Sequence, residues 1–279
     1  MLTCRKKQVF VLDPQGKVLM VESKSIKFSI ITCTKNSEQF LDKTISFVRS
    51  QSHTNYEHIF IDGNSRDGTR RIIESFDSPV VSLHTRDSKG IANAMNEGIK
   101  VASGDIIFHL HSDDYLAHPE VLSRVARYFT SNPCQWLYGR TLLDNDGGWT
   151  PESPLFPVYS YQRLLQGDII PHPATFVRRS LYQKMGLFDE TLKYVMDYDM
   201  WLRLGKETVP AQYQEFFSVF RLHGGSATFS SRMASFEEDH AVRRKHSPFG
   251  IYTLLNEIRV LRRRHQLRRM ISTSGVKQK

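Results

Sequence analysis

The sequence lacks several features that would quickly assign it to a class of protein. It has three cysteines, Cys4, Cys33 and Cys134, an odd number at wide spacings. No disulfide framework or cysteine-based zinc site follows from so few thiols. The chain also lacks a run of about 18 apolar residues, the length that spans a bilayer. Because its N-terminus has no apolar signal-peptide core, we expect a cytoplasmic protein.

Two glycine motifs that bind phosphate are also missing. No Gly-x-Gly-x-x-Gly follows the first predicted strand, and no Gly-x-x-x-x-Gly-Lys-Ser/Thr occurs. In those motifs, backbone N–H groups approach phosphate closely. Their absence counts against dinucleotide oxidoreductases and P-loop enzymes.

Positive charge is abundant but unevenly placed. The net charge is +9, yet residues 243–279 hold eleven Lys or Arg against one acid, a local balance of +10. The preceding residues therefore sum to −1, from 9 − 10. With 40% hydrophobic residues the chain can bury a sizeable core. A neutral domain with a basic tail indicates that the tail attaches the protein to another molecule or surface, and that the domain itself has no nucleic-acid-binding surface.

The basic tail has a helical apolar stripe that leaves two interpretations open. Ile251, Leu254, Leu255, Ile258 and Leu261 recur at helical spacing, with arginines around them. Such a helix can lie on an anionic membrane surface, which would make the protein peripheral at the inner face of the membrane. It can equally pack on the domain and present its charged side to water.

Strand and helix patterns alternate from residue 28 to 110, which predicts an α/β fold with a mostly parallel central sheet and flanking helices. After about residue 130 the alternation fades into a proline-rich loop and one further helix with Tyr198 and Trp201 facing inward. Residues 9–21 read as a hairpin around the turn Asp13–Gly16. The predicted strands are 28–33, 58–61, 80–83, 105–110 and 136–139, and the predicted helices begin near Asn36, run through 72–73, and cover 91–101 and 194–205.

Two adjacent carboxylates, Asp113 and Asp114, directly follow the apolar run 104–110. Like charges so close together repel unless a cation lies between them, and a hard divalent ion bridging to phosphate is the usual solution. The alternative is an ordinary turn capped by Asp.

Polar residues stand at or just after four predicted strands: Thr32, Asp62, Asp87 and the Asp113–Asp114 pair. Since parallel strands end at one edge of a sheet, these positions predict a site for a polar ligand. Asp62 could accept a hydrogen bond from a nucleobase N–H. The segment Asp62–Thr69 also has ordinary turn composition.

Seven motifs follow one another along the chain: Phe28–Asn36, Asp62–Thr69, Asp87–Gly98, His111–Asp114, His172–Phe176, Gly186–Glu190 and Asp197–Arg203. Taken in this order, they resemble the motifs of family 2 glycosyltransferases of the bacterial polysaccharide-biosynthesis type. The resemblance spans about residues 28–225. It implies an inverting GT-A enzyme with a nucleotide-sugar donor.

The resemblance implies a role for individual residues. Thr32, Asp62, Asp87 and Lys89 would hold the nucleoside, a UDP-sugar being favoured. Asp113 would contact the ribose and, with Asp114, the Mn²⁺ or Mg²⁺ that bridges to the diphosphate. Asp197 would be the catalytic base, His223 a further metal contact, and His172 would line the donor–acceptor boundary.

Some positions depart from the family pattern or have a simpler reading. His111 stands where Asn or Asp is common, Met196 where Glu is frequent, and Asn93 where Asp is frequent. A lone His such as His172 is more often structural than a ligand. We interpret Asp199 as the i,i+4 ion-pair partner of Arg203.

The prediction is a metal-dependent inverting glycosyltransferase acting on a hydroxyl of a glycan or lipid-linked acceptor. The predicted protein has an N-terminal hairpin extension (1–27), a GT-A-like domain (28–225, divided at 130 into nucleotide and acceptor halves) and a basic tail (226–279).

One alternative is a sugar nucleotidyltransferase, which would need a glycine-rich basic loop after the first strand. Another is a non-catalytic nucleic-acid-binding protein acting through the tail; on the main interpretation no nucleic acid is bound.

Overall fold

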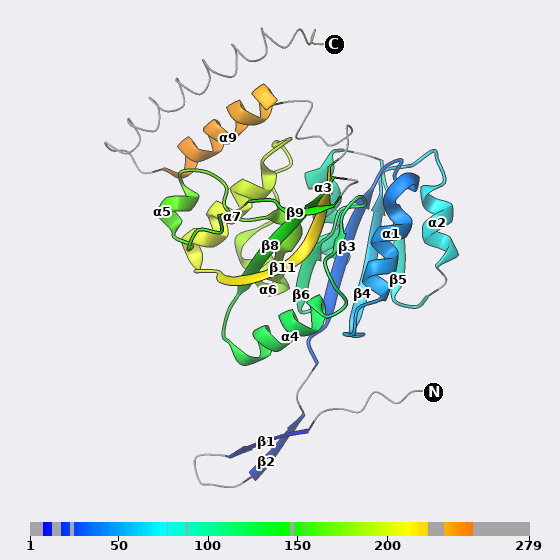
Figure 1. Ribbon diagram of the computed structural model, residues 1–279, viewed down its shortest axis with the longest axis vertical. Helices are drawn as coiled ribbons and strands as arrows, with labels where there is room; N and C mark the ends of the chain where they lie inside the picture. The colour runs from blue at the N-terminus through cyan, green and yellow to red at the C-terminus, as the bar shows by residue number, and fades with distance from the viewer. Residues whose placement is uncertain are drawn as a thin grey trace.

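A computed structural model describes residues 25–222 and 232–247, apart from 77, 88, 146, 147 and 154, and the backbone of 8–12 and 18–22. Figure 1 shows a central sheet flanked by helices. The strands are β1 Gln8–Leu12, β2 Val18–Glu22, β3 Phe28–Thr34, β4 Tyr56–Asp62, β5 Val81–Thr85, β6 Ile106–His109, β7 Tyr115–Leu116, β8 Trp136–Asp144, β9 Trp149–Pro151, β10 Thr175–Arg178 and β11 Ala211–Arg221. The helices are α1 Glu38–Arg49, α2 Thr69–Ser75, α3 Ile91–Val101, α4 Val121–Ser131, α5 Tyr161–Leu164, α6 Arg179–Met185, α7 Met196–Glu207 and α9 Arg232–His246, with a 3-10 turn η1 His172–Ala174.

The central sheet has the strand order β5-β4-β3-β6-β10-β8-β11-β7, with β9 paired to β8. The first four strands of that order are parallel. Antiparallel pairs enter with β10, which lies between β6 and β8, while β11 runs parallel to β8. The α/β fold with a mostly parallel sheet and flanking helices is therefore confirmed.

Strand β3 shows why the sheet is covered on both faces. All seven of its residues are buried, and successive side chains of a strand point to opposite faces. Ile30 belongs to the core cluster that includes Val121 and Val125 of α4, whereas Ile31 belongs to a different cluster that includes Met95 of α3. Burial on both faces is what parallel sheets require, and it explains the continuous apolar run in the sequence.

The reversed strand β10 matters most for the site. It pairs with β6 in the register Phe176–Phe108, and these two rings stack with centroids 4.3 Å apart. Because β10 runs opposite to β6, its start lies beside the end of β6. The turn η1 is thereby carried next to the acidic stretch that follows β6.

The terminal segments are described in part. The predicted N-terminal hairpin is present, since β1 and β2 pair antiparallel from Gln8–Glu22 to Leu12–Val18. The predicted turn Asp13–Gly16 and the predicted helical stripe from Ile251 to Leu261 lie outside the described residues. Helix α9 packs on the domain near α7 (Figure 1). Of the helices described, none is both long and apolar enough to cross a membrane.

Candidate active site

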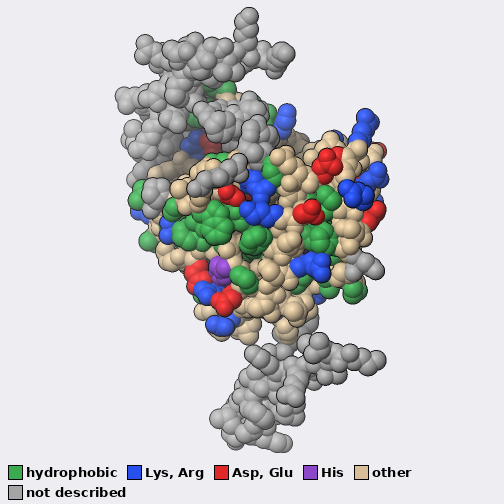
Figure 2. Space-filling view, turned by 45° about the vertical axis from the view of Figure 1, so that its right-hand side comes forward, with side chains coloured by type: hydrophobic (Ala, Val, Ile, Leu, Met, Phe, Trp, Pro, Cys, Tyr) green, Lys and Arg blue, Asp and Glu red, His purple; other side chains and the backbone are tan. Residues whose placement is uncertain are grey.

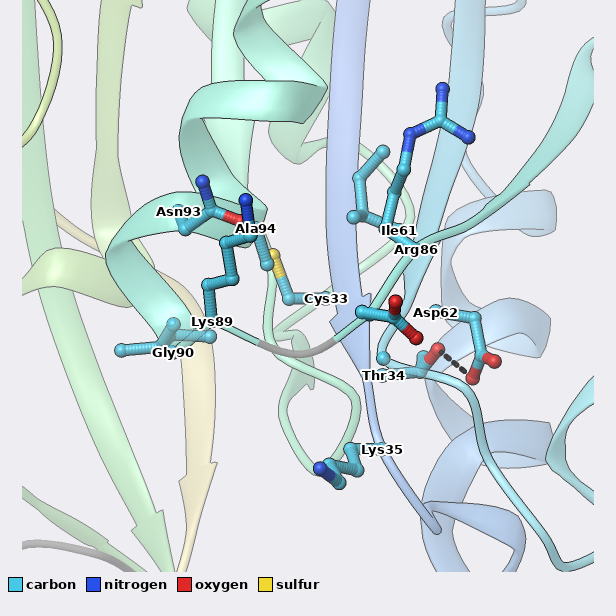
Figure 3. A pocket seen from close by; sticks show the side chains of 13 residues that line it. Cys33, Thr34, Lys35, Ile61, Asp62, Arg86, Lys89, Gly90, Asn93 and Ala94 are labelled. Carbon is cyan, nitrogen blue, oxygen red and sulfur yellow. Dashed lines mark hydrogen bonds between the residues drawn. The ribbon is translucent and has the colours of Figure 1, made fainter. Parts of the chain in front are cut away.

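A cavity of about 220 Å³ opens at the edge where β3, β4 and β5 end. Its walls come from those strand ends, from the loop after β5 and from the start of α3. Figure 3 shows Thr34 and Asp62 on one side of the cavity, with Lys89 and Asn93 on the other. The lining residues are Cys33, Thr34, Lys35, Ile61, Asp62, Gly63, Arg86, Asp87, Lys89, Gly90, Ile91, Asn93 and Ala94.

Asp62 is held firmly at the end of β4. Its Oδ1 accepts hydrogen bonds from the hydroxyls of Thr34 at 3.0 Å and Ser65 at 2.5 Å. Its Oδ2 accepts the backbone N–H of Ser65 at 2.9 Å. A carboxylate offers about four acceptor positions, so these three bonds leave room for one more donor.

Basic side chains line the cavity beside its two acids. Lys35, Arg86 and Lys89 contribute three positive charges, against the carboxylates of Asp62 and Asp87. The cavity walls thus combine a fixed acceptor with a net positive charge. Such a combination suits a ligand that carries both hydrogen-bond donors and anionic groups.

Thr32 does not line the cavity, whereas Thr34 does. The Thr32 side chain is fully buried within β3, and its hydroxyl lies 2.9 Å from His58 Nε2. Burial lowers the pKa of His58 to about 3, so this pair is neutral. The strand continues to residue 34, one past its predicted end. Thr34 is therefore the hydroxyl at the strand end.

The acidic stretch after β6 is a turn anchored to α1. The hydroxyl of Thr44 donates to the backbone oxygens of Ser112 and Asp114 at 2.9 and 2.7 Å. Asp114 is fully buried, and its Oδ1 accepts the backbone N–H of Arg221 at 3.2 Å. Its Oδ2 has no hydrogen-bond partner among the described residues. Burial, and then the charge of Asp113, hold the pKa of Asp114 well above its usual value.

These two carboxylates fit a divalent cation in part. The buried, unpartnered Oδ2 of Asp114 is a hard oxygen ligand of the kind that Mn²⁺ and Mg²⁺ prefer. Asp113, next to it, is partly exposed. Among the described residues, however, no three acidic, His or Cys side chains are grouped as metal ligands. The predicted third ligand, His223, lies outside those residues.

Three histidines, His109, His111 and His172, lie together between the acidic turn and η1. The rings of His111 and His172 stack with centroids 5.0 Å apart, and His109 lies 5.7 Å from His172. The side chain of His172 is only 8% exposed. Neither of its ring nitrogens has a hydrogen-bond partner among the described residues. Burial holds the pKa of His172 well below its usual value, so the ring is neutral.

Asp197 stands beyond this cluster, on the first turn of α7. Its Oδ2 lies 3.8 Å from His172 Nδ1, and its side chain is 27% exposed. Its Oδ1 accepts the backbone N–H of Tyr198 at 2.8 Å. Burial raises the pKa of Asp197 to about 6, and the charge of Glu238 acts in the same direction. A carboxylate with such a pKa is poised to accept a proton near neutral pH.

Asp199, two residues further, has the predicted structural role. It is fully buried, and its Oδ2 accepts a hydrogen bond from Arg203 Nε at 2.9 Å. Hydrogen bonds from His246, Lys245 and Arg203 hold the pKa of Asp199 well below its usual range, against the effect of burial. Asp199 therefore stays ionised and paired.

The structure brings most of the predicted residues to two neighbouring places. Asp62, Asp87 and Lys89 line the cavity, while His172 lies between the acidic turn and Asp197. Thr34, Lys35 and Arg86 also line the cavity and were not predicted. The sequence pattern also did not predict the link between Glu190 and α3. The carboxylate of Glu190 accepts hydrogen bonds from Asn93 and Asn96 of α3, both at 2.9 Å, and residues so far apart in the sequence leave no local signal.

The chain matches a family model and several known proteins. The model of Glycosyl transferase family 2 covers residues 29–186, more than half of the chain. An uncharacterized glycosyltransferase of Mycobacterium tuberculosis is 30% identical over 183 residues, 63% of this chain and 67% of that protein. A PGL/p-HBAD biosynthesis glycosyltransferase of Mycobacterium bovis is 28% identical over 184 residues, 63% of this chain and 68% of that protein.

Solved structures show the same fold. The Staphylococcus aureus TarS 1–349 structure in complex with UDP-GlcNAc has a TM-score of 0.67 at 19% identity, covering 83% of this chain and 69% of that one. The mannosyltransferase PcManGT from Pyrobaculum calidifontis, in complex with GDP-Man and Mn²⁺, has a TM-score of 0.64 at 14% identity. That likeness covers 92% of this chain and 73% of the mannosyltransferase.

Proposed function

The chain belongs to glycosyl transferase family 2, and from that premise we propose a metal-dependent, inverting transfer of a sugar from a nucleotide-sugar donor to an acceptor hydroxyl. The observation that carries this proposal is the order of groups along one sheet edge. A basic cavity, an acidic turn with an unpartnered carboxylate oxygen, and a carboxyl with a raised pKa follow one another. They match the nucleoside, the diphosphate and the acceptor of such a reaction in turn.

In this proposal the cavity holds the nucleoside of the donor. Asp62 uses its remaining acceptor position for a base N–H, because Thr34 and Ser65 fix its carboxylate in place. Lys89 and Asp87 lie at the cavity rim, where the ribose and the first phosphate would stand. A UDP-sugar fits the single acceptor that Asp62 offers, since uracil presents one ring N–H.

Asp113 and Asp114 would hold the divalent cation, with His223 as the proposed further ligand. The unpartnered Oδ2 of Asp114 supports this assignment. When bound, a Mn²⁺ or Mg²⁺ ion neutralises the charge that develops on the departing diphosphate. The PcManGT complex contains both GDP-Man and Mn²⁺, which is compatible with such a requirement.

Asp197 is the proposed base. It takes the proton of the acceptor hydroxyl while the hydroxyl oxygen forms a bond to the anomeric carbon. The bond from that carbon to the diphosphate oxygen breaks on the opposite face, and the nucleoside diphosphate leaves with the bonding electrons. The configuration at the carbon is therefore inverted. His172, neutral and 3.8 Å from Asp197, lines the boundary between donor and acceptor.

A glycan or lipid-linked acceptor is proposed for the open side of the site. Trp149, Leu155 and Val158, on β9 and the segment after it, are 52, 76 and 72% exposed. Figure 2 shows hydrophobic side chains gathered on one face of the molecule, with lysines and arginines beside them. Exposed apolar side chains of this kind suit the lipid part of an acceptor.

The proposal is tested by turnover. The purified chain is incubated with UDP-GlcNAc, UDP-glucose or GDP-mannose and Mn²⁺, and the released nucleoside diphosphate is measured. We expect slow release to water from at least one donor, abolished by EDTA. Asp114→Asn, which removes the charge of a proposed metal ligand, should lose this release, whereas release that is unchanged by EDTA would contradict metal dependence.

A further inference from the structure

We infer that helix α9 holds the proposed base in place, with Glu238 as the positioning residue. The inference rests on the proposed role of Asp197. It extends the machinery to a helix that lies beyond the residues 29–186 matched by the family model.

Glu238 binds the backbone just before α7. Its Oε1 accepts the N–H of Lys193 at 2.8 Å, and its Oε2 accepts those of Tyr194 at 2.6 Å and Val195 at 3.0 Å. Val195 is the residue that precedes the first turn of α7. The first N–H groups of a helix have no partner inside it, and a carboxylate at that end is stabilised by them and by the helix dipole. Glu238 thus anchors, from a distant segment, the backbone that leads into the first turn of α7.

The last turn of α9 contacts α7 on the other side of Asp197. Lys245 Nζ and His246 Nε2 lie 3.0 and 2.9 Å from Oδ1 of the buried Asp199. Arg203 holds the other oxygen of that carboxylate. Helix α9 therefore fixes the backbone at 193–195 and the side chain at 199, and Asp197 lies between the two.

Asp197 itself remains partly exposed between these two attachments. Its orientation toward an acceptor then depends on how the first turn of α7 is held. A displacement of about 1 Å at a reacting group can cost up to a hundredfold in rate. A loss of the Glu238 contacts would produce a displacement of this kind without altering the cavity at β3, β4 and β5.

Glu238 also acts on Asp197 through its charge. The charged or titratable groups that face Asp197 are His172 from η1, Asp168 from the loop before it, and Glu238 from α9. His172 is neutral, while the negative charge of Glu238 raises the pKa of Asp197. Removal of that charge should shift the acid limb of the pH–rate profile to lower pH.

The experiment compares Glu238→Ala and Glu238→Gln with a matched control, Glu207→Ala. Glu207 is an acid at the opposite end of α7, where it binds Lys184. Hydrogen exchange of the full chain reports the backbone at 193–195. Nucleoside diphosphate release from UDP-GlcNAc, UDP-glucose or GDP-mannose with Mn²⁺ gives kcat and donor KM.

In Glu238→Ala we expect faster exchange confined to 193–195 and a kcat lowered by about tenfold to a hundredfold, with donor KM changed less than about twofold. Glu238→Gln, which keeps an acceptor oxygen but loses the charge, should recover part of kcat and shift the acid limb to lower pH. The control should match wild type in kcat, KM and exchange at 193–195.

Unchanged exchange at 193–195 in Glu238→Ala would overturn the inference, as would faster exchange with normal kcat. A loss of donor binding equal to the loss of kcat would also overturn it, since the effect would then be a general one on folding. Failure of the wild-type chain to turn over any of the three donors would instead contradict the proposed function, and the inference with it.

Discussion

Burial sets the charge state of the side chains that matter most in this site. His58 and His172 are buried, and burial keeps both rings neutral. Asp199 is equally buried but accepts hydrogen bonds from His246, Lys245 and Arg203 and stays ionised. Asp197, close to both His172 and Glu238, falls between these cases with a pKa of about 6. Residue type alone would not separate Asp197 from Asp199, whereas their partners do.

The raised pKa of Asp197 predicts a particular pH dependence. A base works only when deprotonated, so turnover should rise with pH through about 6 and level off above it. With an ordinary exposed aspartate as the base, turnover would instead rise near the usual aspartate pKa of about 3.9. Release of nucleoside diphosphate, measured at saturating donor from about pH 4.5 to about pH 8.5, checks this; the interval extends a little beyond the range of about pH 5 to 8 in which proteins are usually most stable.

The control for that profile is Asp197→Asn, which cannot accept the proton. It should bind nucleotide as the wild type does and lose turnover by about a hundredfold to ten-thousandfold, the usual contribution of a general base. Normal turnover by this variant would show that another group takes the proton.

At the scale of elements, the segment before β6 packs so closely on β3 that a larger side chain at Gly104 should lower the stability of the fold. A Cβ at Gly104 would stand 2.6 Å from the backbone nitrogen of Ser29 and 2.8 Å from the carbonyl carbon of Phe28. Backbone atoms in a central strand cannot move away cheaply. Gly104→Ala should therefore lower the free energy of unfolding by about 1–3 kcal/mol, measured by denaturant titration.

The matched substitution is Gly167→Ala, where an added Cβ meets no heavy atom within 4 Å. It should leave the free energy of unfolding within about 0.5 kcal/mol of wild type. Equal stability of the two variants would mean that the loop before β6 is packed less tightly than described.

Elements in the first half of the chain were predictable because their pattern is simple. Helix α3 has the bounds predicted from periodicity, and the buried strands read as continuous apolar runs. The reversed strand β10 was not predictable, because its place between β6 and β8 depends on pairing across distant segments. Thr34 was missed for a local reason: the strand was predicted to end at residue 33, whereas it continues to Thr34, which lies on the same face as Thr32 but at the strand end.

Site residues follow the same division. Asp62 and Asp87 could be located from strand ends, whereas Lys89 followed only from the family resemblance; all three line the cavity. The contacts of Glu238 with residues 193–195 span more than forty positions, so no local pattern reports them. The division of the chain at residues 27, 130 and 225 stays a prediction.

At the scale of the whole molecule, the basic tail should be separable from catalysis. Residues 248–279 contain eight Lys or Arg and one Glu. A chain ending at Ser247 keeps the α9 contacts of Arg243, Lys245 and His246. It should keep donor turnover but lose binding to vesicles that contain anionic lipid, since each basic residue near such a surface contributes about 1 kcal/mol.

Co-sedimentation with vesicles of phosphatidylglycerol and phosphatidylcholine measures this binding, and vesicles of phosphatidylcholine alone are the control. Equal sedimentation of the full and shortened chains would favour the alternative in which the tail packs on the domain. Salt-sensitive RNA binding by the full chain alone would instead favour a nucleic-acid role for the tail.

The central claim is that the basic cavity and the acidic turn together bind a nucleoside diphosphate and its metal. Thermal unfolding of the wild-type chain with UDP or GDP, in Mn²⁺ or in EDTA, tests it most directly. A ligand at a hundred times its Kd stabilises the native state by about 2.7 kcal/mol. We predict a clear rise in Tm with at least one nucleotide in Mn²⁺, much reduced in EDTA. An unchanged Tm with both nucleotides in Mn²⁺ would contradict the account.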